Sequence, residues 1–356
     1  MKKLILWLIV MLVGISMVAT FSLAGCKPAV EEAVVEEAPP VEEEVVEEAP
    51  PAVELPMEGW VVGYLPGSLR DAARVFWSYY TKKGVMDAGA EEFIMIDSEL
   101  DVTRQVADGE DILEMGIDIL VMNPNDADAM IPIVEKANEM GIPVVCIDRA
   151  TNGGDVICTT GLDNWQIGEE AAALLLELIG EGKVLHIQGT LGASVVYERG
   201  ESFRLGLKDH PEIEIVGEPA SEYWTAEDGL AYTEDVLTAH PDLVAVYTHT
   251  DTITEGAIAA VKAAGKVDQV TFFSQGWYGG IPDIMKEGSA TVYDWAVDPI
   301  AIGKATADVC IKIAKGELDI IPRKIAVPNQ LVTMETVDEY WEKLNLNLLD
   351  VSAVEL

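Results

Sequence analysis

The chain has 356 residues, which is enough to bury a sizeable core and is typical of about two domains with accessory segments. Its formal net charge is −39 at pH 7, from 23 Lys and Arg against 62 Asp and Glu. This balance argues against nucleic acid as a partner, because binding it needs a basic face that displaces counterions, and it disfavours broad adsorption to anionic lipid.

The first 25 residues are predicted to be a targeting segment. Lys2 and Lys3 precede an apolar run over residues 4–23, and Leu-Ala-Gly-Cys follows, ending at Cys26. This resembles a bacterial lipoprotein signal peptide, after which Cys26 is lipidated and becomes the first residue of the mature chain. The alternative is an uncleaved anchor, because the run approaches the roughly 20 residues that span a bilayer. Both interpretations place the folded part outside the cytoplasm.

After Cys26, the sequence up to residue 58 consists almost only of Glu, Val, Ala and Pro. Prolines and mutually repelling carboxylates keep such a segment extended, so we expect residues 26–58 to be an acidic tether between membrane and folded part. Three further cysteines, Cys146, Cys158 and Cys310, leave an odd number, which cannot form a complete disulfide framework. Buried thiols are the favoured interpretation, and a Cys146–Cys158 bridge is the alternative.

Beyond Gly59, short β-rich runs alternate with helical ones. Amphipathic stretches such as residues 168–178 and 252–264 lie between the strands, and another helix is predicted at 333–344. The alternation predicts an α/β fold, with parallel sheets that carry helices on both faces. The predicted strands are residues 60–64, 93–96, 119–122, 144–147, 184–187, 213–216, 244–247 and 270–273.

The most informative segment is VMNPNDADAMIPIVEKANEMGIPVVCIDR, residues 121–149, which reads as a βαβ unit. Asp148 and Arg149 directly follow its second strand, and ligands of parallel sheets bind beyond the carboxyl ends of the strands. A carboxylate beside a guanidinium suits a molecule rich in hydroxyl groups, because each hydroxyl both donates and accepts hydrogen bonds. A structural ion pair between Asp148 and Arg149 is the alternative.

That segment, together with QGTLGASVVYERGESF (188–203) and LTAHPDLVAVYTHTD (237–251), resembles the sugar-binding proteins of the ribose and galactose type, the solute receptors of ABC importers. The resemblance covers most of the chain after residue 59. It implies the type I periplasmic binding protein fold, in which two doubly wound parallel-sheet lobes are joined by a three-crossing hinge and hold the ligand between them. The crossings are expected near residues 161–163, 293–297 and 326–329. The amino-terminal lobe is then 59–162 with 297–325, and the carboxy-terminal lobe is 163–296 with 326–356.

The resemblance also implies a set of ligand-binding residues. Asp148 and Arg149 belong to one lobe, and Arg199 is sent from the other lobe to the same sugar. Trp224 falls where relatives place an aromatic wall. For Arg199 the alternative is an ion pair at a helix start with Glu198 or Glu201, and for Trp224 it is a place in the core.

Two of the matched positions depart from the ribose-type pattern. Relatives carry Asn-Asp where this chain has Thr250 and Asp251, and they carry an Asp where this chain has Gln275. Losing a carboxylate while both arginines remain disfavours ribose itself. A monosaccharide or polyol is therefore expected, with a sugar acid or phosphorylated sugar as the less favoured case.

The loop after the first strand and the second crossing align less closely. Phe76 or Trp77 could stack on the ligand, and Arg70 or Arg74 could reach it. Asp294 or Trp295 could replace a glutamine of the family at the second crossing.

Catalytic motifs are missing from the sequence. HExxH, GxSxG and GxxxxGK[ST] are absent, so we expect neither an enzyme nor a metal or other cofactor. A glycoside hydrolase would need two carboxyl groups about 5 to 10 Å apart across the sugar, and the matched set offers only Asp148 and Asp294. Sugar-responsive repressors of the lac repressor family share the fold but need an amino-terminal helix-turn-helix, where this chain has a lipobox.

The expected function is that of a lipid-anchored, monomeric solute-binding protein that hands its ligand to an ABC permease. The alternative is an extracytoplasmic sensor that signals to a receptor kinase or chemoreceptor.

Overall fold

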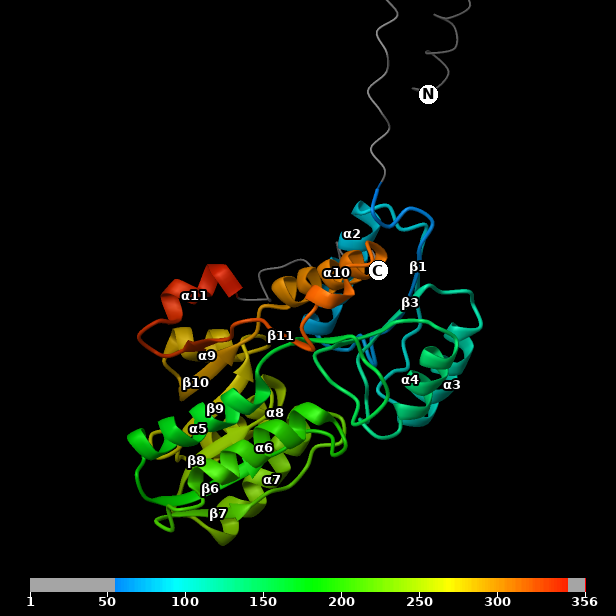
Figure 1. Ribbon diagram of the computed structural model, residues 1–356. Helices are drawn as coiled ribbons and strands as arrows, with labels where there is room; N and C mark the ends of the chain where they lie inside the picture. The colour runs from blue at the N-terminus through cyan, green and yellow to red at the C-terminus, as the bar shows by residue number, and fades with distance from the viewer. Residues whose placement is uncertain (1–54, 345–355) are drawn as a thin grey trace, which may run out of the picture. The chain divides into compact units, whose positions relative to one another are not determined.

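The computed structural model describes residues 55–344 and residue 356. The predicted signal peptide, Cys26, most of the tether and the tail after residue 344 lie outside this part. The described residues form two six-stranded sheets flanked by helices (Figure 1), so the predicted α/β class with two parallel-sheet lobes is confirmed. Within the same part of the chain, no helix combines the length and the apolar character needed to cross a membrane.

The first sheet has the spatial order β11-β5-β4-β3-β1-β2 and is parallel throughout. Its strands β3 and β4 are apolar over their whole length because both faces are covered. Val121 and Val145 pack with α2 and α10, whereas Leu120 and Val144 pack with α3 and α4. The strands are β1 (Val61–Leu65), β2 (Glu92–Met95), β3 (Ile119–Met122), β4 (Val144–Ile147), β5 (Cys158–Gly161) and β11 (Lys324–Ala326), and the helices are α2 (Ala72–Asp87), α3 (Val102–Leu113), α4 (Ile131–Glu139) and α10 (Pro299–Ala314).

The second sheet has the spatial order β12-β10-β9-β8-β6-β7 and is parallel except for the pair of β10 and β12. Leu185 of β6 packs with α7 and α8, and its neighbour Val184 packs on the other face with α5 and α6. The strands are β6 (Gly182–Ile187), β7 (Ile213–Gly217), β8 (Leu243–Thr248), β9 (Thr271–Gly276), β10 (Thr291–Ala296) and β12 (Gln330–Val332), and the helices are α5 (Asn164–Leu178), α6 (Ser194–Leu207), α7 (Ala226–Ala239), α8 (Asp251–Ala263) and α9 (Ile281–Glu287). A short 3-10 helix, η1 (Leu318–Ile320), precedes β11, and α11 (Val337–Leu344) follows β12.

Side chains cap the starts of several helices. In five of them an Asp or Thr side chain accepts a hydrogen bond from the backbone N–H three residues further on, which satisfies one of the orphan donors of the first turn. These caps are Asp71, Asp101, Asp163, Thr225 and Asp298. The caps of α2 and α7, Asp71 and Thr225, lie at the cavity described below.

The eight predicted strands are all present, but four short or polar strands, β5, β10, β11 and β12, were not predicted as strands. The second crossing was placed too early. Residues 293–296, expected to belong to it, continue β10 in register with β9, and the chain leaves the sheet at Val297. The first expected crossing, 161–163, lies between β5 and α5, and the third, 326–329, lies between β11 and β12.

The predicted end of the tether at residue 58 was also too late. Met57 is fully buried in the core of the first sheet, and its N–H donates to the carbonyl of Ala88. The folded part therefore begins before Gly59, because Met57 supplies apolar surface to the core. Cys146, Cys158 and Cys310 are free and buried, as expected for structural thiols, and the alternative Cys146–Cys158 bridge is not formed.

Candidate functional site

A cavity of about 370 Å³ is lined by residues from both sheets and their helices. Its walls come from the loops after β1, β4, β8 and β9 and from the first turns of α2, α6, α7 and α8. This is where parallel sheets bind ligands, because strand ends and helix starts leave backbone groups free for contacts. The lining residues are Ser68, Arg70, Asp71, Ala73, Arg74, Trp77, Leu100, Asp148, Arg149, Leu162, Val195, Arg199, Tyr223, Trp224, Thr225, Ala226, Glu227, His249, Thr250, Thr252, Gln275, Tyr278 and Val297.

Asp148 sits in a tight turn directly after β4. Its backbone φ is 63°, which is uncommon for a residue other than glycine. The Asp148 N–H donates to Thr160 O at 2.6 Å, and the amide of Asn123 donates to Ile147 O at 2.6 Å. Gly161 packs so closely that a Cβ there would lie 2.9 Å from Asp148 Cα. The neighbouring strands therefore hold the turn and aim Asp148 at the cavity.

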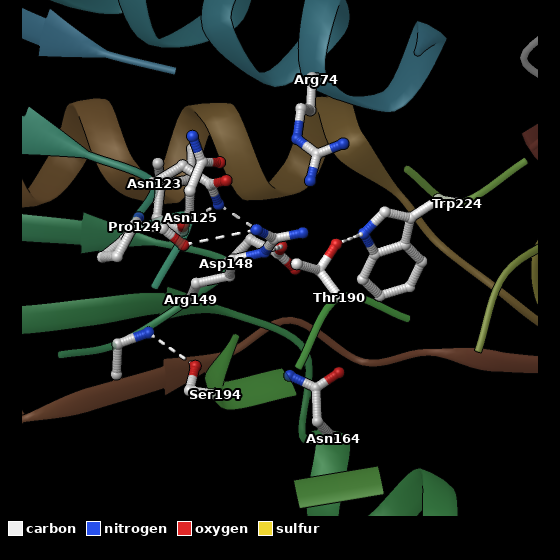
Figure 2. Close-up of polar contacts among 12 residues, drawn as sticks. Arg74, Asn123, Pro124, Asn125, Asp148, Arg149, Asn164, Thr190, Ser194 and Trp224 are labelled. Carbon is white, nitrogen blue, oxygen red and sulfur yellow. Dashed lines mark hydrogen bonds and ion pairs between the residues drawn. The ribbon is translucent and has the colours of Figure 1, made fainter. Parts of the chain in front are cut away.

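Arg149, the next residue, is almost fully buried, with 1% of its surface exposed. Its Nη1 donates to Pro124 O at 3.4 Å, and its guanidinium carbon lies 5.5 Å from the centre of the Trp224 ring (Figure 2). Its Nε is 3.9 Å from Asp148 Oδ2, too far for a hydrogen bond. Burial, the largest cause, and the charge of Arg74, the second, lower the pKa of Arg149 to about 9. The contact between Asp148 and Arg149 is therefore loose, and it is not a hydrogen-bonded structural pair.

Trp224 lies in the loop between β7 and α7, as the sequence indicated, and lines the cavity. Its φ is 58°, and its Nε1 donates to Thr190 Oγ1 at 2.7 Å, a bond drawn in Figure 2. The ring rests on Gly189, where an added Cβ would lie 2.1 Å from the ring carbons. The missing side chain at Gly189 therefore creates the seat for the indole.

Arg199 reaches the cavity from α6 and is 4% exposed. Its Nε and Nη2 donate to Asn164 Oδ1 at 2.9 and 2.6 Å, and its Nη1 donates to His249 O at 2.8 Å. The alternative of a salt bridge with Glu198 or Glu201 is wrong, because the Arg199 guanidinium bonds Asn164 and the His249 carbonyl, and Glu201 pairs with Arg204. Neutral acceptors thus hold Arg199 in place.

His249, whose carbonyl accepts from Arg199, continues into a buried hydrogen-bonded chain. Its Nε2 lies 2.9 Å from Nε2 of His186, whose Nδ1 lies 2.8 Å from Glu218 Oε1. Burial lowers the pKa of both histidines, which favours a neutral imidazole for His249 in the cavity wall and for His186 behind it. The hydrogen bond from His186 lowers the pKa of Glu218 to about 2.

Of the two aromatic candidates on α2, the structure brings only Trp77 to the cavity. Phe76 packs in the core of the first sheet, so the expectation that it stacks on a ligand was wrong. The two residues are neighbours on a helix and point about 100° apart, which lets only one face the cavity. Arg70 and Arg74 both line it, and Arg74 forms an ion pair with Asp71.

Of the candidate residues at the strand ends of the second sheet, some line the cavity and others lie behind it. Thr250 and Gln275 line the cavity, whereas Asp251 and Asp294 are fully buried behind it. Asp251 accepts from the N–H of Tyr278 at 2.8 Å, and Asp294 accepts from the N–H of Trp277 at 3.0 Å. Direct ligand contact by these two carboxyls was therefore a wrong prediction, because both are fully buried outside the cavity lining and accept from backbone N–H groups.

Trp295, the alternative at the second crossing, also lies outside the cavity lining and donates from Nε1 to Glu170 at 2.7 Å.

Several lining residues were missed by sequence reasoning. Tyr278 lies in a loop that carries no periodic signal, and its hydroxyl bonds Thr250 Oγ1. Tyr223 adjoins Trp224, and Asp71 caps α2. Only the N-cap pattern before an apolar run could have located Asp71.

The cavity offers groups for hydrogen bonding and stacking. Among residues 55–344 and 356, no group of three or more His, Cys, Asp or Glu side chains has the spacing to hold a metal ion. The guanidinium of Arg74 lies over the Trp77 ring and that of Arg149 over the Trp224 ring, and Arg199 and Asp148 line the same cavity. This combination suits a small molecule with apolar C–H faces and several hydroxyl groups.

Comparison with known proteins gives a consistent result. A family model described as "Periplasmic binding protein domain" matches residues 71–318. The ribose import binding protein RbsB of Bacillus subtilis (strain 168) is 33% identical over 260 residues, which cover 71% of this chain and 82% of that protein. RbsB of Salmonella typhimurium is 34% identical over 230 residues, which cover 63% of this chain and 75% of that protein.

Among solved structures, an ABC transporter solute binding protein from Bacillus halodurans C-125 with bound myo-inositol is similar over 81% of this chain and 99% of that chain. The TM-score is 0.73 and the sequence identity is 26%.

Proposed function

The chain belongs to the periplasmic binding protein family, and from this premise we propose that it is the sugar-binding component of an ABC importer. It captures a monosaccharide or related polyol in the cavity and delivers it to the permease. The similarity to proteins named for ribose import supports transport over sensing. Like these relatives, which are binding proteins, it needs no catalytic step.

One observation carries the proposal. Asp148, Arg149, Arg199 and Trp224, which come from three separate segments of the sequence, line the same cavity. The cavity of about 370 Å³ falls at the lower end of the range for small-molecule sites, which suits a single sugar ring. The ligand then touches groups from both lobes, and contacts shared in this way favour the closed arrangement of two hinged lobes.

The proposal also includes how the protein is anchored and that it is a monomer. The family is extracytoplasmic, and the lipobox that ends at Cys26 supports attachment through a lipid. The acidic tether then separates the folded lobes from the membrane, and the protein acts as a monomer. The lobes are residues 59–162 with 297–325, and 163–296 with 326–356, to which the short segment around Met57 adds.

Isothermal titration against a panel of neutral pentoses, hexoses and inositols and of acidic sugars tests the function. We expect one panel member to bind with one site per chain. Trp224→Ala should weaken its binding at least tenfold, about 1.4 kcal/mol, because the stacking face is lost. The matched control is Trp165→Ala, since Trp165 lies on α5 outside the cavity lining and bonds Glu169. A silent panel of neutral and acidic sugars, or equal affinity in both variants, would reject the proposed function.

A further inference from the structure

Charged side chains are distributed unevenly between the cavity and the rest of the chain. The net charge of the whole sequence is −39, yet in the described part of the chain four arginines line the cavity against three carboxylates. Arg70 and Glu227 are exposed, so the inner wall holds three arginines and two aspartates. The inner arginines are Arg74, Arg149 and Arg199, and the aspartates are Asp71 and Asp148.

Two of the inner arginines have an aspartate within ion-pair distance, and in the described part of the chain Arg199 has no such partner. Asp71 is committed to Arg74, both as its ion-pair partner and as the cap that accepts from its backbone N–H at 2.9 Å. Arg199 is bonded only to an amide oxygen and a carbonyl. Arg149 has Asp148 at 3.9 Å, beyond hydrogen-bond distance. One buried guanidinium charge is thus left without a close counterion, and burying such a charge is costly.

Hydrogen-bond donors are in surplus as well. Among the described residues that line the cavity, four buried side-chain nitrogens have no hydrogen-bond partner: Arg74 Nε, Arg149 Nε, Trp77 Nε1 and His249 Nδ1. The first three can only donate. A hydroxyl group brings a donor with every acceptor, whereas a carboxylate or phosphate brings acceptors and negative charge. An anion therefore matches the unsatisfied donors of the cavity wall better than a further hydroxyl group does.

The two inner arginines with unpaired Nε atoms also approach each other. Figure 2 shows Arg74 descending from α2 toward the guanidinium of Arg149, beside Trp224. After burial, the charge of Arg74 is the largest cause of the lowered pKa of Arg149. An anion placed near both groups would turn this repulsion into two attractions, with bidentate geometry available from each planar fork.

We propose that the ligand carries one anionic group, a carboxylate or a phosphate, in addition to its hydroxyl groups, and that Arg74 and Arg149 receive it. This rests on the proposed function, since it concerns the same cavity. Gln275 also favours an anionic ligand, because its neutral amide at the cavity wall adds no charge that would repel the anion.

Isothermal titration with D-glucose, D-glucuronate, D-gluconate and D-glucose 6-phosphate separates the possibilities. We expect at least one of the three anions to bind tenfold or more tightly than glucose, and the carboxylate and phosphate arms identify which group is preferred. Gln275→Glu places a nearly isosteric negative charge at the wall and should weaken binding of the anion at least tenfold more than it weakens binding of glucose. Gln166→Glu is the matched control, since Gln166 is exposed on the first turn of α5 outside the cavity.

Arg74→Gln provides a second variant that removes one of the two receiving groups and should likewise cost the anion at least tenfold. Thermal unfolding of each variant shows whether it is folded. A wild-type protein that binds a neutral sugar as tightly as its acid overturns the inference and leaves the transport function intact. Equal losses for anion and neutral sugar in folded Gln275→Glu would also overturn it. Failure of every neutral and acidic probe would reject the proposed function instead.

Discussion

Asp251 and Asp294 illustrate how single side chains behind the cavity set the properties of the molecule. Both are fully buried, and burial raises the pKa of Asp251 to about 7 and that of Asp294 well above its ordinary value. Two adjacent carboxyls cannot both ionise in such a place, so the pair retains a proton. Ser274 Oγ and the N–H groups of Trp277 and Tyr278 hold the pair in position.

This pair predicts a specific pH dependence of stability. The unfolded chain loses both protons above about pH 4, whereas the folded chain keeps them to about pH 7 or beyond, so stability should fall as pH rises through this window. Asp294→Asn removes one acid, and its loss of stability between pH 4.5 and pH 8 should be smaller by at least about 1.4 kcal/mol, the equivalent of one pKa unit. Urea unfolding at the two pH values measures this difference.

The matched control is Asp87→Asn on the exposed end of α2, which should leave the pH dependence unchanged. A wild-type slope in the Asp294→Asn variant would contradict the shared proton.

For single residues, the sequence predicted the positions of those that directly follow regular strands. Asp148 and Arg149 come directly after an apolar strand in a βαβ unit, so the fold rules place them at the sheet edge. Asp251 and Asp294 could not be assigned in the same way. A carboxylate in a sequence is expected to be exposed, and these two come together behind the wall because β8 pairs with β9 and β9 pairs with β10. The choice between Phe76 and Trp77 needed the rotation of α2, which no local pattern supplies.

Among the elements, α5 and α6 position Arg199 through close contact. Gly168 of α5 packs against α6 so tightly that a Cβ would lie 2.0 Å from Ser202 Oγ and 2.3 Å from Arg199 O. The bond from Arg199 to Asn164, also on α5, depends on the same spacing. The glycine therefore links the packing of two helices to the geometry of the cavity wall.

Gly168→Ala should consequently destabilise the protein by about 1–3 kcal/mol, because the helices must separate to accept the methyl group. It should also weaken ligand binding, since Arg199 moves with α6. Gly200→Ala on α6 is the control, because its nearest neighbour is the flexible end of Gln188, 3.0 Å away. Urea unfolding and titration of both variants check the prediction, and equal stability of the two would contradict the account of this packing.

Element prediction succeeded where a strand is long and apolar and failed where a strand depends on its partner. The β3 and β4 strands are buried on both faces, and their sequences show it. By contrast, β11 is the three-residue segment Lys324–Ala326, which becomes a strand by pairing with β5, more than 160 residues earlier in the chain. The resemblance placed the second crossing near residues 293–297, but pairing with β9 keeps Tyr293, Asp294 and Trp295 in the sheet.

Considered as a whole molecule, the chain combines a very acidic composition with arginines around its cavity. The net charge of −39 keeps the protein soluble, and at physiological ionic strength charges farther than roughly 8 Å from a ligand are largely screened. The buried arginines inside the cavity escape this screening. Selection for an anionic ligand is therefore compatible with the acidic surface.

Hydrogen bonds also join segments that follow strands of the first sheet to the start of α6 in the second lobe. The Ala127 N–H donates to Gly192 O, and the Ala150 N–H donates to Ser194 Oγ, each at 2.9 Å. We expect these bonds to form when the lobes close over a ligand, because they add to the contacts that the ligand itself shares between the lobes.

A crystal structure of the protein with the tightest-binding compound of the sugar panels is the most direct test. The account predicts that the compound fills the cavity, stacks on Trp224 and is hydrogen-bonded by Asp148 and Arg149 from one lobe and Arg199 from the other. A compound bound elsewhere, with these side chains engaged only with one another, would contradict it.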